Sequence, residues 1–162
     1  MGRDRCLPID LPPIYRNVVW HYHGIEANIA YKEHHKDTER ETYHFHAISD
    51  VDGRTEIETR KGKTIDVPSM KLETFFDKIG IAFCDLLVVD VEGMEWEIFQ
   101  AYSGRVPIEH AIVEFHHTRE REEPTHTEDA FKYLLESKGF EIMCRHLTNC
   151  GGTQEWTVRR QT

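Results

Sequence analysis

The sequence has no long apolar run and no excess of positive charge. No run approaches the roughly 18 residues that a membrane-spanning helix needs, and the N-terminal stretch MGRDRCLPIDLPP lacks the apolar centre of a secretory signal. A formal net charge of −9 argues against a nucleic-acid backbone or an anionic membrane as the main partner. We therefore expect a cytoplasmic protein that binds neither nucleic acid nor membranes.

The sequence also lacks closely spaced cysteine pairs and an early glycine-rich turn. The cysteines Cys6, Cys84, Cys144 and Cys150 include no Cys-x-x-Cys pair, which favours reduced thiols, with a disulfide as the alternative. No glycine-rich turn follows an early strand. The length of 162 residues fits one domain. We expect an irregular segment at 1–16 and a domain at 17–162.

Two apolar runs end in clusters of polar residues. The run Leu86–Val89 stops at Asp90, Glu92 and Glu95, and the run Ala111–Val113 stops at Glu114, His116 and His117. Such runs are typical of buried strands in an open α/β sheet, and ligands bind at the carboxyl edge of these sheets. The sequence therefore predicts that chemistry, if there is any, takes place at this edge.

Periodicity and turn residues predict the elements around these two strands. In the first part of the chain we expect a strand at 17–22, a polar helix-like segment at about 28–40, and strands at 42–48 and 55–59 joined by a hairpin at Asp52-Gly53. A helix that opens at Pro68-Ser69 and ends at Gly80 should follow, and then a strand at 86–89, a helix at about 94–102 and a strand at 111–115. The last elements expected are a helix with a Thr125/Glu128 capping box that ends at Gly139, and strands near 140–146 and 154–159. This order predicts an α/β fold with a mostly parallel sheet and a C-terminal antiparallel hairpin.

Several of these motifs together resemble the FkbM family of S-adenosylmethionine-dependent methyltransferases. They are Leu72-Glu73 on a short helix, the Asp90-x-Glu92-Gly93-x-Glu95 motif, a later strand ending in Glu114 with His116, and the upstream AISDVDG at 47–53. The resemblance covers roughly residues 17–160. It implies a Rossmann-like methyltransferase fold, S-adenosyl-L-methionine as cofactor, and a sugar or other small hydroxylated acceptor. The family's first strand and glycine-rich cofactor loop have no counterpart, so we expect an N-terminally truncated fold.

The resemblance also assigns roles to individual residues. It implies cofactor contacts for Glu26, Ala47, Ile48 and Asp90, catalytic roles for Asp90, Glu92 and His116, and substrate contacts for Glu95, Glu114 and His117. Each acid has a structural alternative. Glu26 could stabilise a helix N-terminus instead of binding ribose hydroxyls, Asp90 could be the N-cap of the next helix, and Glu92 a first-turn acid.

Three questions stay open at the level of sequence. The pairs His21/His23 and His44/His46 could converge on zinc or nickel, or Asp90 and Glu92 could hold a divalent ion, but we assign no metal. The chain could be an inactive, truncated domain that serves as a binding or scaffold module. Without a first strand, neighbouring strand edges stay open, so they must pair directly, recruit residues 1–16, or form a homo-oligomer.

Overall fold

The computed structural model describes residues 19–59, 62–91, 93–116, 127–147 and 154–161. Its largest sheet has the strand order β6-β7-β9-β8. The bounds are β6 (Cys84–Val89), β7 (Ile108–Phe115), β8 (Phe140–Leu147) and β9 (Gln154–Arg160). β6 and β7 are parallel, and β9 runs antiparallel to both of its neighbours. The expected C-terminal hairpin is therefore confirmed, with β8 at the edge.

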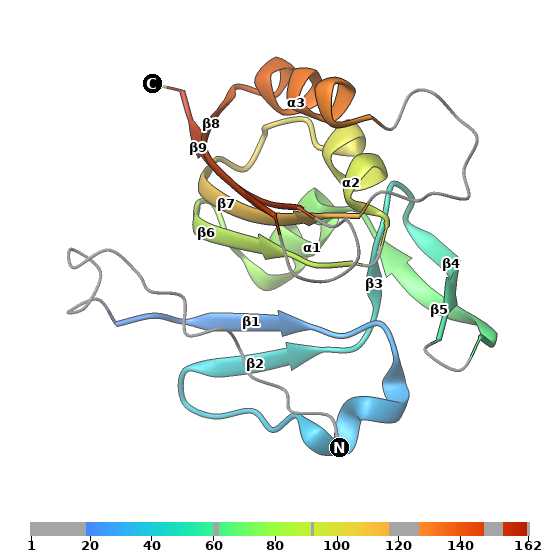
Figure 1. The fold of residues 1–162 in the computed structure, drawn as a ribbon. Coiled ribbons are helices and arrows are strands. Elements are labelled where there is room, and N and C mark those ends of the chain that lie inside the picture. The colour runs from blue at the N-terminus through green and yellow to red at the C-terminus, as the bar shows by residue number, and fades with distance from the viewer. Residues whose placement is uncertain (1–18, 60–61, 92, 117–126, 148–153, 162) are drawn as a thin grey trace.

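Three helices accompany this sheet. They are α1 (Leu72–Ile79), α2 (Glu95–Ala101) and α3 (Glu128–Ser137). Figure 1 shows α2 and α3 together on one side of the sheet. Residues Gly80 and Gly139 follow α1 and α3 with φ of 73° and 83°, a region that favours glycine. No helix within the described ranges is long and apolar enough to cross a membrane.

Two smaller sheets precede the large one. β1 (Tyr22–Ile25) pairs in parallel with β2 (Glu41–His44), and the 3-10 helix η2 (Ile29–His34) connects them. β3 (Ala47–Ile48) pairs in parallel with β5 (Thr64–Met70), which also pairs antiparallel with β4 (Gly53–Glu58). Among the described strands, parallel and antiparallel pairs are equally frequent, so the fold is mixed α/β rather than built on one mostly parallel sheet.

Three local predictions need correction. Asp52-Gly53 does not close a hairpin between 42–48 and 55–59; the hairpin joins β4 to β5, and β3 lies on the other side of β5. Pro68 and Ser69 lie in β5, so α1 begins only at Leu72. The N-cap of α3 is Thr127, whose side chain accepts the Ala130 N–H, whereas Thr125 lies outside the described residues.

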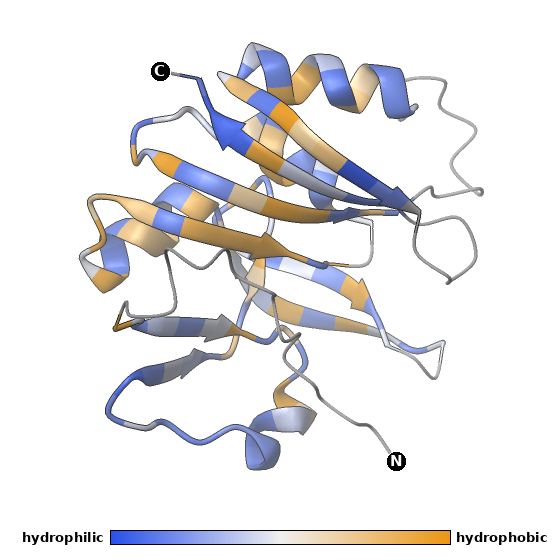
Figure 2. Ribbon diagram, turned by 60° about the vertical axis from the view of Figure 1, so that its left-hand side comes forward, coloured by the Kyte–Doolittle hydropathy of each residue, from blue (hydrophilic) through white to orange (hydrophobic). Residues whose placement is uncertain are grey.

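Aromatic rings fill the core between α2, α3 and the large sheet. Phe131 of α3 is fully buried, stacks on Phe115 of β7 at 4.3 Å between ring centroids, and meets Phe99 and Trp156 edge-on. Such pairs contribute beyond their buried area. Figure 2 shows the contrast with β1 and β2, which are mostly hydrophilic.

Strand β6 is less buried than its sequence predicts. Of its apolar run Leu86–Val89, only Val89 is buried, and Val88 is 43% exposed. Within the described part of the chain β6 pairs with β7 alone, and β1 pairs with β2 alone. One edge of β6 and one edge of β1 therefore pair with no other described strand. The segment predicted at 1–16 lies outside the described residues.

The structure describes two of the four cysteines. Cys84 and Cys144 form no disulfide, and Cys6 and Cys150 lie outside the described residues. Burial raises the pKa of the Cys84 thiol to about 11, so this thiol stays protonated near neutral pH. Cys84 therefore packs as a small apolar side chain beside the core.

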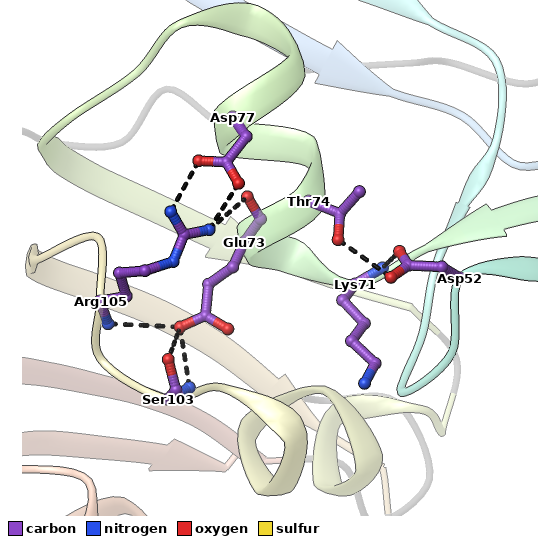
Figure 3. A network of polar contacts seen from close by, with 7 residues as sticks. All are labelled: Asp52, Lys71, Glu73, Thr74, Asp77, Ser103 and Arg105. Carbon is purple, nitrogen blue, oxygen red and sulfur yellow. Dashed lines mark hydrogen bonds and ion pairs between the residues drawn. The ribbon is translucent and has the colours of Figure 1, made fainter.

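A carboxylate on α1 anchors the loop that follows α2. Glu73 Oε1 accepts the backbone N–H groups of Ser103, at 2.8 Å, and Arg105, at 3.3 Å (Figure 3). Arg105 in turn binds the exposed carboxylate of Asp77 on the same helix. The Leu72-Glu73 motif therefore has a structural role: Leu72 enters the core and Glu73 satisfies backbone donors that no helix or strand uses.

Three histidines gather beside α1. His23 Nδ1 lies 3.3 Å from His44 Nε2, and the buried ring of His46 packs on Phe75. His46 Nε2 is buried without a hydrogen-bond partner among the described residues. Burial, with help from the nearby Lys78 and His44, lowers the pKa of His46 from its ordinary 6.5 to about 4. His46 is therefore neutral in the folded chain near pH 7.

We predict that Phe131→Ala lowers the free energy of unfolding by about 3–5 kcal/mol, because it removes a fully buried ring and leaves a cavity. Urea unfolding measures the change. Tyr133→Ala is the matched control, since Tyr133 lies on the same helix but is 75% exposed. Equal losses in the two variants would contradict the position of the core.

Glu73→Ala should lower the free energy of unfolding by about 1–2 kcal/mol, because it leaves the Ser103 and Arg105 N–H groups without their carboxylate partner. Asp77→Ala, which removes only an exposed ion pair on the same helix, should cost less. Thermal or urea unfolding compares the two variants. A larger loss in Asp77→Ala would overturn this role of Glu73.

The pKa of His46 also predicts a pH dependence. Because this pKa is lower in the folded chain than in the unfolded chain, the unfolded state binds more protons between the two values. The contribution of the neutral His46 to the free energy of unfolding is therefore fully present above about pH 6.5, and it is lost as the pH drops toward about 4. His46→Gln should flatten this slope in urea unfolding, whereas His21→Gln, at an exposed position, should leave it unchanged. An unchanged slope in His46→Gln would contradict the account.

Candidate active site

The parallel pairing of β6 and β7 brings the polar clusters together. Val89 of β6 is in register with Val113 of β7, so the carboxyl ends of the two strands lie side by side. Asp90 directly follows β6, Glu114 is near the end of β7, and His116 comes directly after it. Glu114 and His116 are two positions apart and reach the same cluster, as strand alternation predicts.

His116 is held by a buried carboxylate. Its Nδ1 lies 2.8 Å from Glu95 Oε1, and Glu95, in the first turn of α2, is only 1% exposed. The same oxygen accepts the N–H of Gly93 at 3.1 Å. Because a carboxylate accepts hydrogen bonds, Nδ1 carries the proton in this contact, and in the neutral form of the ring Nε2 is then the acceptor.

The Nε2 atom of His116 faces two further carboxylates. It lies 3.9 Å from Asp90 Oδ1 and 4.0 Å from Glu114 Oε1. The exposed fractions of these side chains are 16% for His116, 30% for Glu114 and 56% for Asp90. The cluster therefore opens to solvent on the side of Asp90, where a ligand could approach Nε2.

The structure excludes the alternative in which Asp90 is the N-cap of α2. The N-cap of α2 is Met94, and no side chain caps this helix, so Asp90 is not its N-cap. Its position beside His116 instead agrees with a role in the site. Glu92 and His117, predicted as catalytic and substrate-binding residues, lie outside the described residues.

Glu95 occupies a different place from the other acids. We predicted a substrate contact for it, but its carboxylate is buried and bonded to His116 and Gly93. What the geometry provides is a positioning contact, and a direct substrate contact stays a prediction. Gly93 has φ of 106°, which explains why glycine stands at this point of the motif. Sequence reasoning did not identify its N–H as a partner of Glu95.

The predicted cofactor residues lie at the ends of other strands. Glu26 follows β1, and its Oε1 accepts the Asn28 N–H at 2.7 Å just before η2. This contact fits the alternative in which Glu26 stabilises a helix N-terminus. The second carboxylate oxygen of Glu26, Oε2, takes no part in this hydrogen bond. Ala47 and Ile48 form β3, where Ala47 is buried. Their contact with a cofactor stays a prediction.

The remainder of the AISDVDG motif shapes the turn between β3 and β4. The buried hydroxyl of Ser49 donates to the carbonyl of Val51 at 3.0 Å. Asp52 then reaches the start of α1, where its carboxylate accepts the Lys71 N–H and the Thr74 hydroxyl (Figure 3). These contacts explain the motif structurally without invoking a ligand.

The histidine pairs do not assemble the metal site that their spacing suggested. His21 lies before β1 and is exposed, whereas His23 stacks on His44, and the rings of His44 and His46 contact each other and Phe75. Across the described residues, a single group of three or more potential metal ligands occurs, and it consists of Asp90, Glu114 and His116. A pair of ligands from Asp90 and Glu92 involves a residue outside those described.

One of three comparisons with known proteins found a match. The family model of the methyltransferase FkbM domain matches residues 13–142, which include β1 to β7, α1 to α3 and all residues of the cluster. Neither a search of curated proteins nor a search of solved structures found a match. Because the model matches well over half of the chain, the protein belongs to the FkbM methyltransferase family.

Proposed function

We propose that the chain transfers a methyl group from S-adenosyl-L-methionine to a hydroxyl of a sugar or another small hydroxylated acceptor. Membership in the FkbM methyltransferase family supports the reaction class. The observation that carries the assignment of the site is the contact between His116 and the buried Glu95. It holds the imidazole so that Nε2 faces Asp90 and Glu114, at the edge where α/β sheets bind ligands.

The donor set fits a cationic nucleoside cofactor. S-adenosyl-L-methionine supplies an electrophilic methyl group on a positively charged sulfur. Asp90, which is largely exposed at the end of β6, provides a negative charge that attracts such a cation. The carboxylate of Glu26 at the end of β1 is suited to ribose hydroxyls.

The residues of the cluster can activate the acceptor. A hydroxyl placed against His116 Nε2 would give its proton to the ring as its oxygen bonds to the methyl carbon, while the carbon–sulfur bond breaks and S-adenosylhomocysteine leaves. Glu95 would stabilise the imidazolium that forms, because its carboxylate faces Nδ1. Glu114 could accept a hydrogen bond from a neighbouring hydroxyl and so align the attacking oxygen.

The second candidate function is a binding or scaffold module without catalysis. The exposed residues of β6 favour it, since this strand pairs on one side only within the described residues. The cluster favours the enzyme, because a buried carboxylate that orients a histidine beside two further acids suits general-base catalysis. We also propose a cytoplasmic location and a small-molecule acceptor as the partner.

Transfer of a radiolabelled methyl group to a panel of sugars and other hydroxylated compounds tests this proposal. His116→Asn should lower kcat by about 10²- to 10⁴-fold, the usual contribution of a general base. The matched control is His110→Asn, because His110 lies on β7 about 20 Å from His116 by strand rise. Cofactor binding without transfer to any acceptor, or equal effects of the two variants, would favour the scaffold function.

A further inference from the structure

We propose that Asp90, Glu114 and His116 form a binding site for one divalent cation, of the kind that accepts mixed oxygen and nitrogen ligands. One potential ligand atom from each residue lies within 4.8 Å of the others. The site comprises two carboxylates and one imidazole, which together offer two negative charges to a dication. Its use in methyl transfer rests on the proposed function, whereas its existence does not.

The distances allow a cation after a small movement. Metal–ligand distances of about 2.1 Å place two adjacent ligands roughly 3 Å apart. His116 Nε2 lies 3.9 Å from Asp90 Oδ1 and 4.0 Å from Glu114 Oε1, so each pair must close by about 1 Å. Asp90 is 56% exposed, and its side chain has the space to rotate.

The contact between His116 and Glu95 is the second, independent observation. Metal-binding histidines typically donate the N–H of the other ring nitrogen to a carboxylate, which fixes the tautomer and orients the ring. Glu95 does this from a position that is 1% exposed, at 2.8 Å from Nδ1. A surface group of acids has no need of such a buried partner, whereas a ligand that must point its lone pair in one direction does.

The ligand set also indicates the kind of ion. Two carboxylates and one imidazole suit Mn²⁺, Fe²⁺ or Zn²⁺ better than Ca²⁺, which prefers oxygen ligands alone. Three protein ligands leave coordination positions open, and the exposed side of Asp90 is where a hydroxyl or water could fill them. A cation bound there would acidify a coordinated hydroxyl. Because the cation would occupy the Nε2 lone pair, His116 would serve as the base only in the cation-free chain.

Titration of the chelator-treated full chain with Mn²⁺, followed by electron paramagnetic resonance, tests the site. We expect one bound Mn²⁺ per chain. Asp90→Asn and Glu114→Gln should each weaken binding at least tenfold, because each removes a charged ligand. Glu95→Gln should weaken it by about 10- to 100-fold without removing a ligand, the usual effect of losing the partner of a metal-binding histidine.

Two controls make the result specific. Asp85→Asn removes an exposed carboxylate from the other end of β6, and His110→Asn removes an imidazole from β7; neither should change the affinity for Mn²⁺. Urea unfolding of each variant verifies that it is folded. Equal Mn²⁺ binding by the wild type, Asp90→Asn and Glu114→Gln would overturn the proposal, as would no binding at millimolar Mn²⁺.

The outcomes also separate this site from the proposed function. Specific Mn²⁺ binding without methyl transfer to any acceptor would support the cation site and contradict the enzyme. Methyl transfer that persists in chelator, together with no Mn²⁺ binding, would overturn the cation site and leave His116 as the base.

Discussion

The parallel pairing of β6 with β7 is the constraint on which the candidate site depends. Its register sets Val89 against Val113, so residues that follow each strand meet although more than 20 positions separate them in the chain. The pairing is supported by the aromatic core under β7, where Phe115 stacks on Phe131. A shift of one residue in this register would reverse the sides of Glu114 and His116 and dissolve the cluster.

Hydrogen bonds to the buried Glu95 orient the residues at the ends of these two strands. Glu95 enters from the first turn of α2, is buried, and fixes the protonation of His116 through Nδ1. Gly93 contributes its N–H to the same carboxylate from a backbone conformation that favours glycine. At the opposite edge of the sheet, the loop that leads from α2 into the amino end of β7 is held by Glu73 of α1.

Sequence reasoning predicted which residues meet at the candidate site but not the internal geometry of their cluster. The apolar runs and the acids that follow them predicted the strand ends and the proximity of Asp90, Glu114 and His116, because parallel strands end at a common edge. The bond between Glu95 and His116 could not be predicted, since helical spacing does not say that Glu95 turns inward. Nor could the spacing of His21, His23, His44 and His46 predict that most of these rings would pack on one another instead of around an ion.

The errors in the fold have similar physical causes. Pro68-Ser69 resembles a helix start because proline is common in a first helical turn, yet pairing with β4 and β3 keeps these residues extended in β5. The apolar run in β6 predicted burial on both faces, but within the described residues β6 pairs with β7 alone and Val88 is 43% exposed. Both errors concern the pairing of strands that are distant in the sequence, and local sequence patterns do not predict this pairing.

Calorimetric titration of the chain with S-adenosylhomocysteine tests the central claim most directly, because it requires no knowledge of the acceptor. Asp90→Ala removes the carboxylate at the end of β6, and Asp85→Ala, at the other end of the same strand, is its control. The account predicts micromolar binding that is lost in Asp90→Ala and retained in Asp85→Ala. No binding by the wild type up to millimolar ligand would contradict it.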